Sequence, residues 1–398
     1  MAKLASEPRQ LLGGISPEQF LREYWQKKPL LIRQAIPNYE CPVDADDLAG
    51  LALEKEVESR IILETDEDKP WVLKNGPFSE ETFASLPSTH WTLLIQQLDA
   101  WDPDINALKQ LFSFIPNWRI DDVMASYAPE GGSVGPHFDQ YDVFLLQAQG
   151  RRHWRLGQYC DTHASTRSDT ELSILTEFSE SEEWILEPGD MLYVPPKLAH
   201  FGVAADECIT LSIGFRAPAQ HTMLSQFTDF LLEHTQDQLY SDPRLEPQNS
   251  PGLLSSNAIA QLQTLMLGAV QNADLFEQWA GCFLTEPKNP QVIIPTEYEY
   301  TWADLEKASE EDLDIEKNEG SRFVYHQSDQ YIRLYVDGHD FQLSQTDLTF
   351  VQYLCDQAKL SAQQIVNICA TLEAKQAFCA LVNYGSLLID EDDGSPSN

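Results

Sequence analysis

Gly135-Pro136-His137-Phe138-Asp139 is the stretch that decides the fold, together with the distant His200. Residues i and i+2 of a β-strand point to the same side, so His137 and Asp139 can reach one ion from a single short strand. The third ligand must then come from a strand far away in the sequence, which a double-stranded β-helix brings alongside. Two histidines and one carboxylate on one face of an octahedron are the ligand set of non-haem Fe(II) oxygenases, which leaves the opposite positions free for a co-substrate and dioxygen.

The residues around these ligands favour a metal site over a chance pair of polar loop residues. Residues 131–136 are rich in glycine, which permits tight turning and close backbone approach. Residues 141–147 have the apolar character of a strand. Residues 187–196 then predict a turn, a short strand and a rigid proline corner, with His200 on the strand that follows.

The segment that ends at His200 resembles a known motif. Gly189, Pro195 and His200 have the spacing of the second cupin motif, and Lys197 stands where that motif usually has glycine. This departure concerns one backbone position and leaves the predicted metal ligand in place.

Residues 135–144, 150–155 and 214–218 resemble segments of the bacterial ribosomal oxygenases, a group within the JmjC/cupin superfamily of 2-oxoglutarate oxygenases. The resemblance covers most of the chain, although the C-terminal half matches more by layout than by motif. It implies an α+β protein with a JmjC-type double-stranded β-helix (cupin) core, flanking helices, a helical dimerisation region and a C-terminal winged-helix-like domain. It also implies a 2-oxoglutarate-dependent dioxygenase that hydroxylates the β-carbon of an arginine in ribosomal protein L-sixteen.

The resemblance assigns roles to five residues. His137, Asp139 and His200 are the expected Fe(II) ligands, with 2-oxoglutarate and dioxygen as the expected co-substrates. Arg152 is the expected partner of the far carboxylate of 2-oxoglutarate, because a guanidinium fork matches a carboxylate bidentately. Ser126 matches a hydroxyl that contacts the co-substrate.

Strand parity alone does not fix which arginine faces the barrel interior. Arg151 or Arg155 points inward if the register differs by one residue. Ser212 is a second candidate for lining the pocket. Tyr141 and Asp142 are candidates for holding an arginine of the substrate, although Asp142 equally can cap a turn. Histidines without partners at ligand spacing are expected to be solvated or packed residues: His153, His163 and His221.

Two other functions remain open on the sequence. The same chemistry can act on a histidyl residue or a methyl-lysine of another protein, although demethylation needs a cage for the methylammonium group. Alternatively, the chain is a cupin binding module without turnover. The presence of all three ligands together with a co-substrate arginine favours an enzyme, because a scaffold has no need of them.

Composition restricts the partners and the compartment. The chain has 63 acidic and 26 basic residues and a formal charge of −37, which opposes direct nucleic-acid binding. The same charge suits a basic ribosomal protein through long-range steering, although an acidic surface can also serve solubility alone. Seven cysteines form no C-x-x-C pair, and neither a secretory signal nor a membrane span is recognisable. We therefore expect reduced thiols and a cytoplasmic protein.

A chain of 398 residues is expected to contain two or three domains. The predicted boundaries are residues 1–217 for the oxygenase domain with its N-terminal helices, 218–290 for a helical region, 291–390 for the winged-helix-like domain and 391–398 for a disordered acidic tail. The resemblance implies that the helical region forms a homodimer. From Thr301 onward there are 18 acidic and 6 basic residues, which makes a DNA-binding wing improbable.

Local patterns predict the elements outside the core. Ser16 is the expected N-cap of a helix with Pro17 in its first turn. Apolar spacing predicts further helices over the ranges 44–55, 104–112, 223–234, 259–270, 275–283, 345–357, 361–369 and 373–381. Strands are expected over the ranges 29–33, 60–64, 71–74, 92–96, 322–326, 331–336, 341–343 and 386–390.

Overall fold

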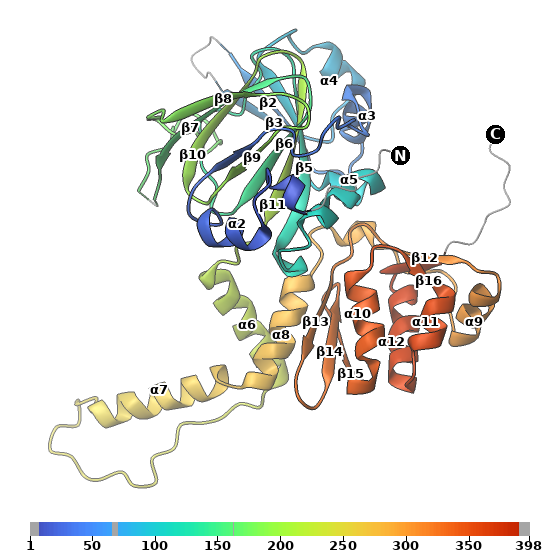
Figure 1. Cartoon of the computed structure of the whole chain (residues 1–398). Helices are drawn as coiled ribbons and strands as arrows, with labels where there is room; N and C mark the ends of the chain where they lie inside the picture. The colour runs from blue at the N-terminus through green and yellow to red at the C-terminus, as the bar shows by residue number, and fades with distance from the viewer. Residues whose placement is uncertain (1–7, 66–70, 162, 390–398) are drawn as a thin grey trace. The chain divides into compact units, whose positions relative to one another are not determined.

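The chain forms two compact units. Figure 1 shows the computed structural model, which describes residues 8–65, 71–161 and 163–389. The first unit runs to Ala217 and also includes Asn289–Ile293 and Asn318–Gly320, and the second unit takes the remainder. The predicted acidic tail, residues 391–398, lies outside the described residues. None of the helices in the described ranges has the length and apolar character that a membrane span requires.

Two antiparallel sheets make up the β-structure of the first unit. The larger sheet has the strand order β1-β9-β6-β11-β5-β4-β2-β3, and the smaller has the order β10-β7-β8. Their strands are β1 (Leu30–Ile32), β2 (Ser59–Glu64), β3 (Trp71–Asn75), β4 (Trp91–Ile95), β5 (Ile120–Ala128), β6 (Val143–Gln149), β7 (Arg152–Tyr159), β8 (Glu182–Leu186), β9 (Met191–Val194), β10 (Leu198–Ala204) and β11 (Cys208–Phe215). The strands predicted before the oxygenase core are confirmed to within about two residues at each end.

Strand alternation separates two apolar cores in this unit. Val143 and Leu145 of β6 face the interior between the sheets, where they share a cluster with Trp154 and Leu156 of β7. Phe144 faces the other side of the larger sheet and joins the core beneath the N-terminal helices. Because both sheets contribute to the interior cluster, they lie face to face and form the barrel of a double-stranded β-helix (Figure 1).

The N-terminal helices begin as predicted and end earlier. Ser16 accepts a hydrogen bond from the backbone of Gln19 at the start of α2 (Pro17–Glu23). Asp44 caps α3 (Ala45–Leu51), which stops before residue 55 because Leu53 to Lys55 are exposed and bury no apolar face. The other short helices are α1 (Pro8–Leu11), α4 (Glu80–Ala84), η1 (Leu98–Ala100) and η3 (Asn117–Arg119).

The helix predicted over residues 104–112 is two elements instead of one. An α-helix, α5 (Pro103–Ala107), is followed by a 3₁₀ helix, η2 (Leu108–Phe112). In a 3₁₀ helix residues i and i+3 lie above one another, so Leu108 and Leu111 point into the same core. Burial of this pair explains why the tighter winding replaces a continued α-helix.

The second unit begins with the three predicted helices, α6 (Gln220–His234), α7 (Ser256–Val270) and α8 (Ala273–Thr285). Helices α6 and α8 pack through a cluster that includes Phe227, Leu231 and Trp279. In contrast, α7 has no buried residue and extends away from α8 in Figure 1. Its apolar side chains are therefore not buried against any of the residues that the structure describes.

The rest of the second unit is a mixture of short helices and two three-stranded sheets, ordered β16-β12-β17 and β13-β14-β15. The predicted hairpin strands and helices are present: β13 (Phe323–Gln327), β14 (Ile332–Val336), β15 (His339–Leu343), α10 (Leu348–Asp356), α11 (Ala362–Ile368), α12 (Leu372–Asn383) and β17 (Leu387–Ile389). Elements without a sequence prediction are η4 (Pro290–Val292), α9 (Trp302–Glu310), β12 (Asp314–Lys317) and β16 (Leu360–Ser361). The helix predicted over residues 345–357 begins as the 3₁₀ helix η5 (Gln345–Asp347) and continues as α10. Strand β12 is predominantly charged and β16 has two residues, so neither carries an alternating apolar signal.

Candidate metal and co-substrate site

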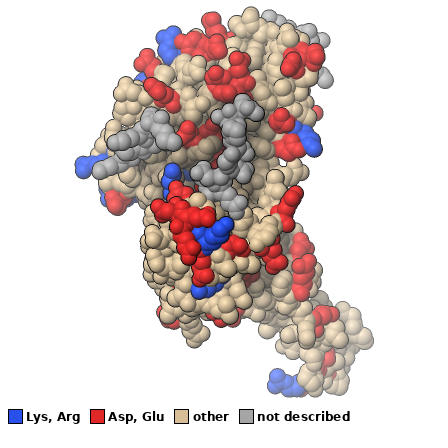
Figure 2. Space-filling model, turned by 90° about the vertical axis from the view of Figure 1, so that its right-hand side faces the viewer, with Lys and Arg blue, Asp and Glu red and all other residues tan. Residues whose placement is uncertain are grey.

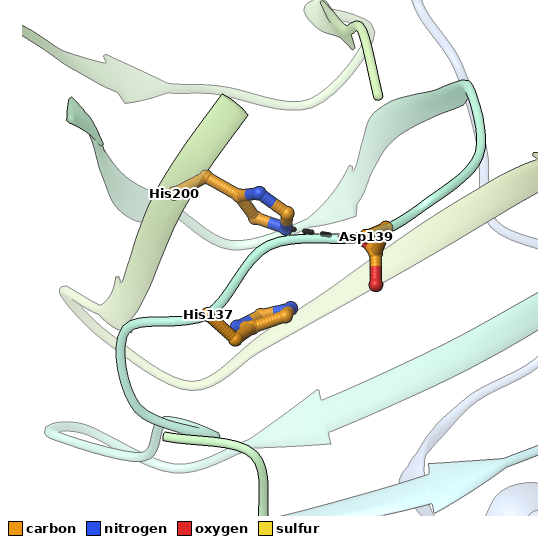
Figure 3. Close-up of side chains that lie close together, drawn as sticks. All are labelled: His137, Asp139 and His200. Atoms are coloured by element: carbon orange, nitrogen blue, oxygen red, sulfur yellow. Dashed lines mark ion pairs between the residues drawn. The ribbon is translucent and has the colours of Figure 1, made fainter. Parts of the chain in front are cut away.

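Three side chains converge on a common space (Figure 3): His137, Asp139 and His200. One ligand atom from each lies within 4.8 Å of the other two. Nε2 of His200 is 3.5 Å from Oδ2 of Asp139, and the two imidazole ring centroids are 4.3 Å apart. Ligand atoms that each lie about 2.1 Å from a common ion are about 3–4 Å from one another, so this spacing suits one divalent metal ion.

Backbone carbonyls orient both imidazoles. Nδ1 of His137 is 2.9 Å from the carbonyl oxygen of Gly135, and Nδ1 of His200 is 3.0 Å from that of Leu198. Each Nδ1–H can therefore donate to a carbonyl, which leaves the lone pair of Nε2 free for a metal. Burial, with a contribution from nearby His137, lowers the pKa of His200 to about 4, so this imidazole is neutral at neutral pH.

The prediction that His137 and Asp139 share one short strand is wrong. His137 forms an isolated bridge with His200, and residues 138–142 belong to no strand. Gly135 has a φ of +80°, in the left-handed region that a strand does not use, and Pro136 has no N–H for a ladder. The two ligands therefore reach the common space from a loop.

Backbone hydrogen bonds hold this loop against β10. His137 N–H donates to the His200 carbonyl at 3.1 Å, and His200 N–H donates back at 2.8 Å. Further back, Ser133 forms a bridge with Val203 and its hydroxyl donates to the Gly202 carbonyl at 2.7 Å. The segment around His137 is thus hydrogen-bonded to β10, the strand that carries His200.

Arg152 and Ser126 lie together inside the barrel. Arg152 is 2% exposed, and its guanidinium donates to Oγ of Ser126 at 2.8 Å. Its Nε is buried and has no hydrogen-bond partner among the described residues. Burial lowers the pKa of Arg152, so an anion bound beside it would stabilise its charged form. A buried guanidinium with an unused donor fits a carboxylate ligand.

Comparisons with known proteins identify the family of the chain. Residues 107–223 match the family model of the JmjC domain, and residues 260–387 match that of the ROXA-like winged helix. The ribosomal protein uL16 3-hydroxylase of Escherichia coli is 37% identical over 288 residues, which cover 71% of this chain and 74% of the relative. The chain belongs to the ribosomal oxygenase family.

Solved structures extend the similarity over nearly the whole of this ribosomal oxygenase. The X-ray structure of E. coli YcfD has a TM-score of 0.87 and 31% identity, and covers 94% of this chain and 98% of its own. YcfD in complex with cobalt and 2-oxoglutarate has a TM-score of 0.83 and 30% identity, with coverage of 95% and 99%. The predicted JmjC/cupin fold with flanking helices and a winged-helix-like domain is confirmed.

The structure also separates the three arginines of this ribosomal oxygenase that the sequence left as alternatives. Arg151 is exposed and pairs with Asp206 at 2.8 Å. Arg155 is only partly buried, and its guanidinium lies 4.3 Å from the centroid of the Phe201 ring. Both have the opposite strand parity to Arg152, which explains why Arg152 alone of the three lies beside Ser126.

Tyr141 and Asp142 have different surroundings, although both were candidates for holding the substrate. Tyr141 is 43% exposed and lies near the Asp139 carboxylate. Asp142 is fully buried and its carboxylate is occupied by protein donors, among them Tyr193. The buried position and internal partners of Asp142 leave it no surface for a substrate arginine.

Two polar residues of the barrel interior were not predicted from the sequence. Gln147 and Thr210 are both buried, and the Thr210 hydroxyl donates to the Gln147 side chain at 3.1 Å. Thr210 is the register partner of Ser126, so this pair lies next to the Arg152–Ser126 hydrogen bond. Ser212 shares the strand parity of Thr210 and is partly buried. The sequence signal that could have predicted these two residues is the occurrence of polar side chains at alternating positions of the strands β6 and β11.

Lys197 occupies a strained backbone position beside the metal site. Its φ is +68°, in the left-handed region where glycine is favoured. This geometry explains why glycine is usual there in the motif. A lysine in this conformation costs about 1–3 kcal/mol. Two backbone hydrogen bonds help to offset this cost: the Lys197 N–H donates to the Asp139 carbonyl, and the Lys197 carbonyl accepts from the Cys160 N–H.

Proposed function

We propose that this ribosomal oxygenase hydroxylates the β-carbon of an arginine in ribosomal protein uL16, with Fe(II) and 2-oxoglutarate. The observation that carries the proposal is the His137–Asp139–His200 cluster beside the buried Arg152–Ser126 pair. The relative named as a uL16 3-hydroxylase supports the substrate, and YcfD with cobalt and 2-oxoglutarate supports the cofactor class.

The described residues fit the proposed metal and co-substrate. Two imidazoles and one carboxylate suit Fe(II) and leave three octahedral positions open. The unpaired Nε of Arg152 and the Ser126 hydroxyl offer donors to the far carboxylate of 2-oxoglutarate. When bound, the iron centre supplies the activation of dioxygen, with 2-oxoglutarate as the source of two electrons.

The protein itself positions the reactants and excludes water. His137 and His200 are held as Nε2 ligands by carbonyls that accept from Nδ1. Arg152 fixes the carboxylate end of the co-substrate inside the barrel, where the surrounding strands bury it. The substrate must then present one C–H bond at the open side of the metal, so specificity depends on the groups around Tyr141 and the ligand loop.

Incubation of the purified protein with Fe(II), 2-oxoglutarate and recombinant uL16 tests the proposal. We expect succinate release and one added oxygen atom on an arginine of uL16, located by fragment-ion mass spectrometry. Oxygen on a histidine, or loss of a methyl group from lysine, would assign a different target. No succinate release under any of these conditions would favour the binding-module alternative.

We also propose the domain roles expected from the sequence, with residues 218–290 as a dimerisation region and 291–390 as a winged-helix-like domain. Support comes from α7, where Ile259, Leu262, Met266 and Val270 are 41–69% exposed along one helical face. Such an exposed apolar stripe suits burial against a second copy of the chain.

Placing charge on this stripe should separate the dimer. We expect the double change Leu262→Asp and Met266→Asp to give a monomer by sedimentation velocity, because two carboxylates cannot be buried without partners. Thr264→Asp adds a charge to the opposite face of the same helix and should leave the sedimentation coefficient unchanged. If the double variant sediments like the unmodified protein, α7 does not form the dimer interface.

Electrostatic attraction is proposed to guide the basic substrate, and we propose that the protein does not bind nucleic acid. Figure 2 shows acidic side chains far outnumbering basic ones on the face in view. Raising the salt concentration from about 0.1 to 1 M shortens the screening length from about 10 to 3 Å. We therefore expect the KM for intact uL16 to rise with salt, more than that for a short neutral peptide around the same arginine.

Two results would contradict the electrostatic proposal. Equal salt dependence for the intact protein and the peptide would mean that surface charge does not guide binding. Retention of a duplex DNA fragment by the full chain at physiological salt would contradict the exclusion of nucleic acid. The cytoplasm is the proposed location, supported by the ribosomal substrate class and by seven cysteines that are all free thiols.

A further inference from the structure

Asp142 is an unusually enclosed carboxylate for a residue next to an exposed loop. Its side chain is fully buried, and three donors surround it. The Tyr193 hydroxyl donates to Oδ1 at 2.6 Å, the Gln26 side-chain amide donates to Oδ2 at 3.0 Å, and the Arg119 guanidinium lies 3.3 Å from Oδ2. A buried carboxylate needs such partners, because an unpaired buried charge is strongly disfavoured.

The partners of Asp142 are themselves fixed. Tyr193 lies on β9, packs its ring against Phe20 at 5.0 Å, and accepts a hydrogen bond from the Gln26 backbone at 2.7 Å. Burial, and then the nearby Asp142 charge, raise the pKa of Tyr193 far above its usual value, so its hydroxyl stays protonated and donates. Nε of Arg119 donates to the Arg216 carbonyl at 2.7 Å.

Asp139 lies in a loop that is held at both ends. At one end, His137 exchanges two backbone hydrogen bonds with His200, and the Lys197 N–H donates to the Asp139 carbonyl at 2.7 Å. At the other end, the Asp142 carbonyl accepts from Phe215 N–H at 3.0 Å, and its side chain has the three partners described above. Between these fixed points Gln140 and Tyr141 are exposed. The orientation of the Asp139 carboxylate therefore depends on the hydrogen bonds that hold the loop at Asp142.

We propose that Asp142, Tyr193 and Arg119 form an anchor that positions the Asp139 carboxylate toward the two histidines. This inference rests on the proposed function, because it assigns the anchor a role in metal binding. The anchor residues are positioning residues and lie outside the contact shell of the metal. Loss of the anchor leaves all three ligands present and allows Asp139 to move relative to His137 and His200.

A misplaced Asp139 has two measurable consequences. The metal is bound less tightly, because one of its three protein ligands spends less time in place. The co-substrate is also consumed without hydroxylation of uL16 more often, since productive reaction needs a fixed geometry at the metal. A purely structural role for the anchor predicts neither effect, only lower stability.

The test compares two anchor variants with a matched control in the full-length protein. Tyr193→Phe removes a single oxygen and retains the aromatic packing, and Asp142→Asn removes the charge with little change of shape. The control is Asp190→Asn, because Asp190 is also a buried carboxylate paired with an arginine, Arg33, at 2.6 Å. Each protein is titrated with Co(II) alone, heated to find its unfolding midpoint, and assayed for succinate formed per hydroxylated uL16.

We expect Tyr193→Phe and Asp142→Asn to raise the Kd for Co(II) about 10-fold and to raise the succinate-to-hydroxylation ratio. Asp190→Asn should lower the unfolding midpoint but leave both quantities at the wild-type value. Anchor variants that bind Co(II) as tightly as the wild type, in an enzyme that hydroxylates uL16, would overturn the anchor alone. A wild-type protein that neither binds Co(II) nor modifies uL16 would overturn the proposed function.

Discussion

Alanine at His137, Asp139 or His200 is expected to abolish turnover while the protein remains folded. Each change leaves two protein ligands, which are too few to hold the metal on one octahedral face. The loss of activity should exceed about 100-fold, since even residues behind a metal ligand typically contribute 10–100-fold. Succinate release in the presence of excess Fe(II) measures the activity, and the thermal unfolding midpoint reports the fold.

His153→Ala provides the matched control for these substitutions. His153 is a histidine on β7 whose Nε2 pairs with Glu183 at 2.8 Å on the partly exposed side of the strand. Its loss should leave both iron binding and succinate release at the wild-type level. If any of the three ligand variants retained wild-type turnover with iron as the sole metal, the assignment of that ligand would be wrong.

The second large effect is expected at Arg152. Arg152→Ala should raise the Kd for 2-oxoglutarate at least about tenfold, because a charge-assisted bond to a buried carboxylate contributes about 1.5–3 kcal/mol. Co(II) affinity measured in the absence of 2-oxoglutarate should change much less, since Arg152 lies beside Ser126 and not among the metal ligands. Calorimetric titration of the cobalt-loaded protein with 2-oxoglutarate measures the effect.

Arg155→Ala is the control for Arg152→Ala, because Arg155 lies on the same strand with the opposite parity. Its 2-oxoglutarate affinity should equal that of the wild type. The reverse pattern, with affinity lost for Arg155→Ala and kept for Arg152→Ala, would mean that the co-substrate lies elsewhere. A smaller loss is expected for Ser126→Ala, which removes one neutral hydroxyl.

Much of the site could be predicted because its signals are local or periodic. The spacing of Gly189, Pro195 and His200 predicts a turn, a proline corner and a histidine on the following strand; Gly189 has the positive φ of a tight turn, and His200 lies on β10. Helices α6, α7 and α8 form as predicted because their apolar residues recur at helical spacing. The inward position of Arg152 needed the register of β7 against its neighbours, which single-strand parity does not contain.

What the sequence did not predict depends on contacts between distant segments. His137 was expected on a strand, yet Gly135 and Pro136 end any ladder there and the pairing with His200 replaces it. Asp142 is enclosed by Tyr193 and Arg119, which are far from it in the chain. The local sequence around this loop aspartate therefore could not predict that it is buried. Long-range polar contacts of this kind have no periodic signature.

The two-way backbone bridge between His137 and His200 has a consequence for metal exchange. In proteins whose metal site forms only on folding, binding free energy is folding free energy, and removal of the ion unfolds the chain. Here hydrogen bonds between main-chain atoms join His137 to His200 in addition to any bond through a metal. We therefore expect the protein to stay folded when the metal dissociates, so that the ion bound depends on which metals the cell makes available. Because nickel, copper and zinc rank above Fe(II) in affinity for such ligands, loading with the wrong metal is a direct route to an inactive but intact enzyme.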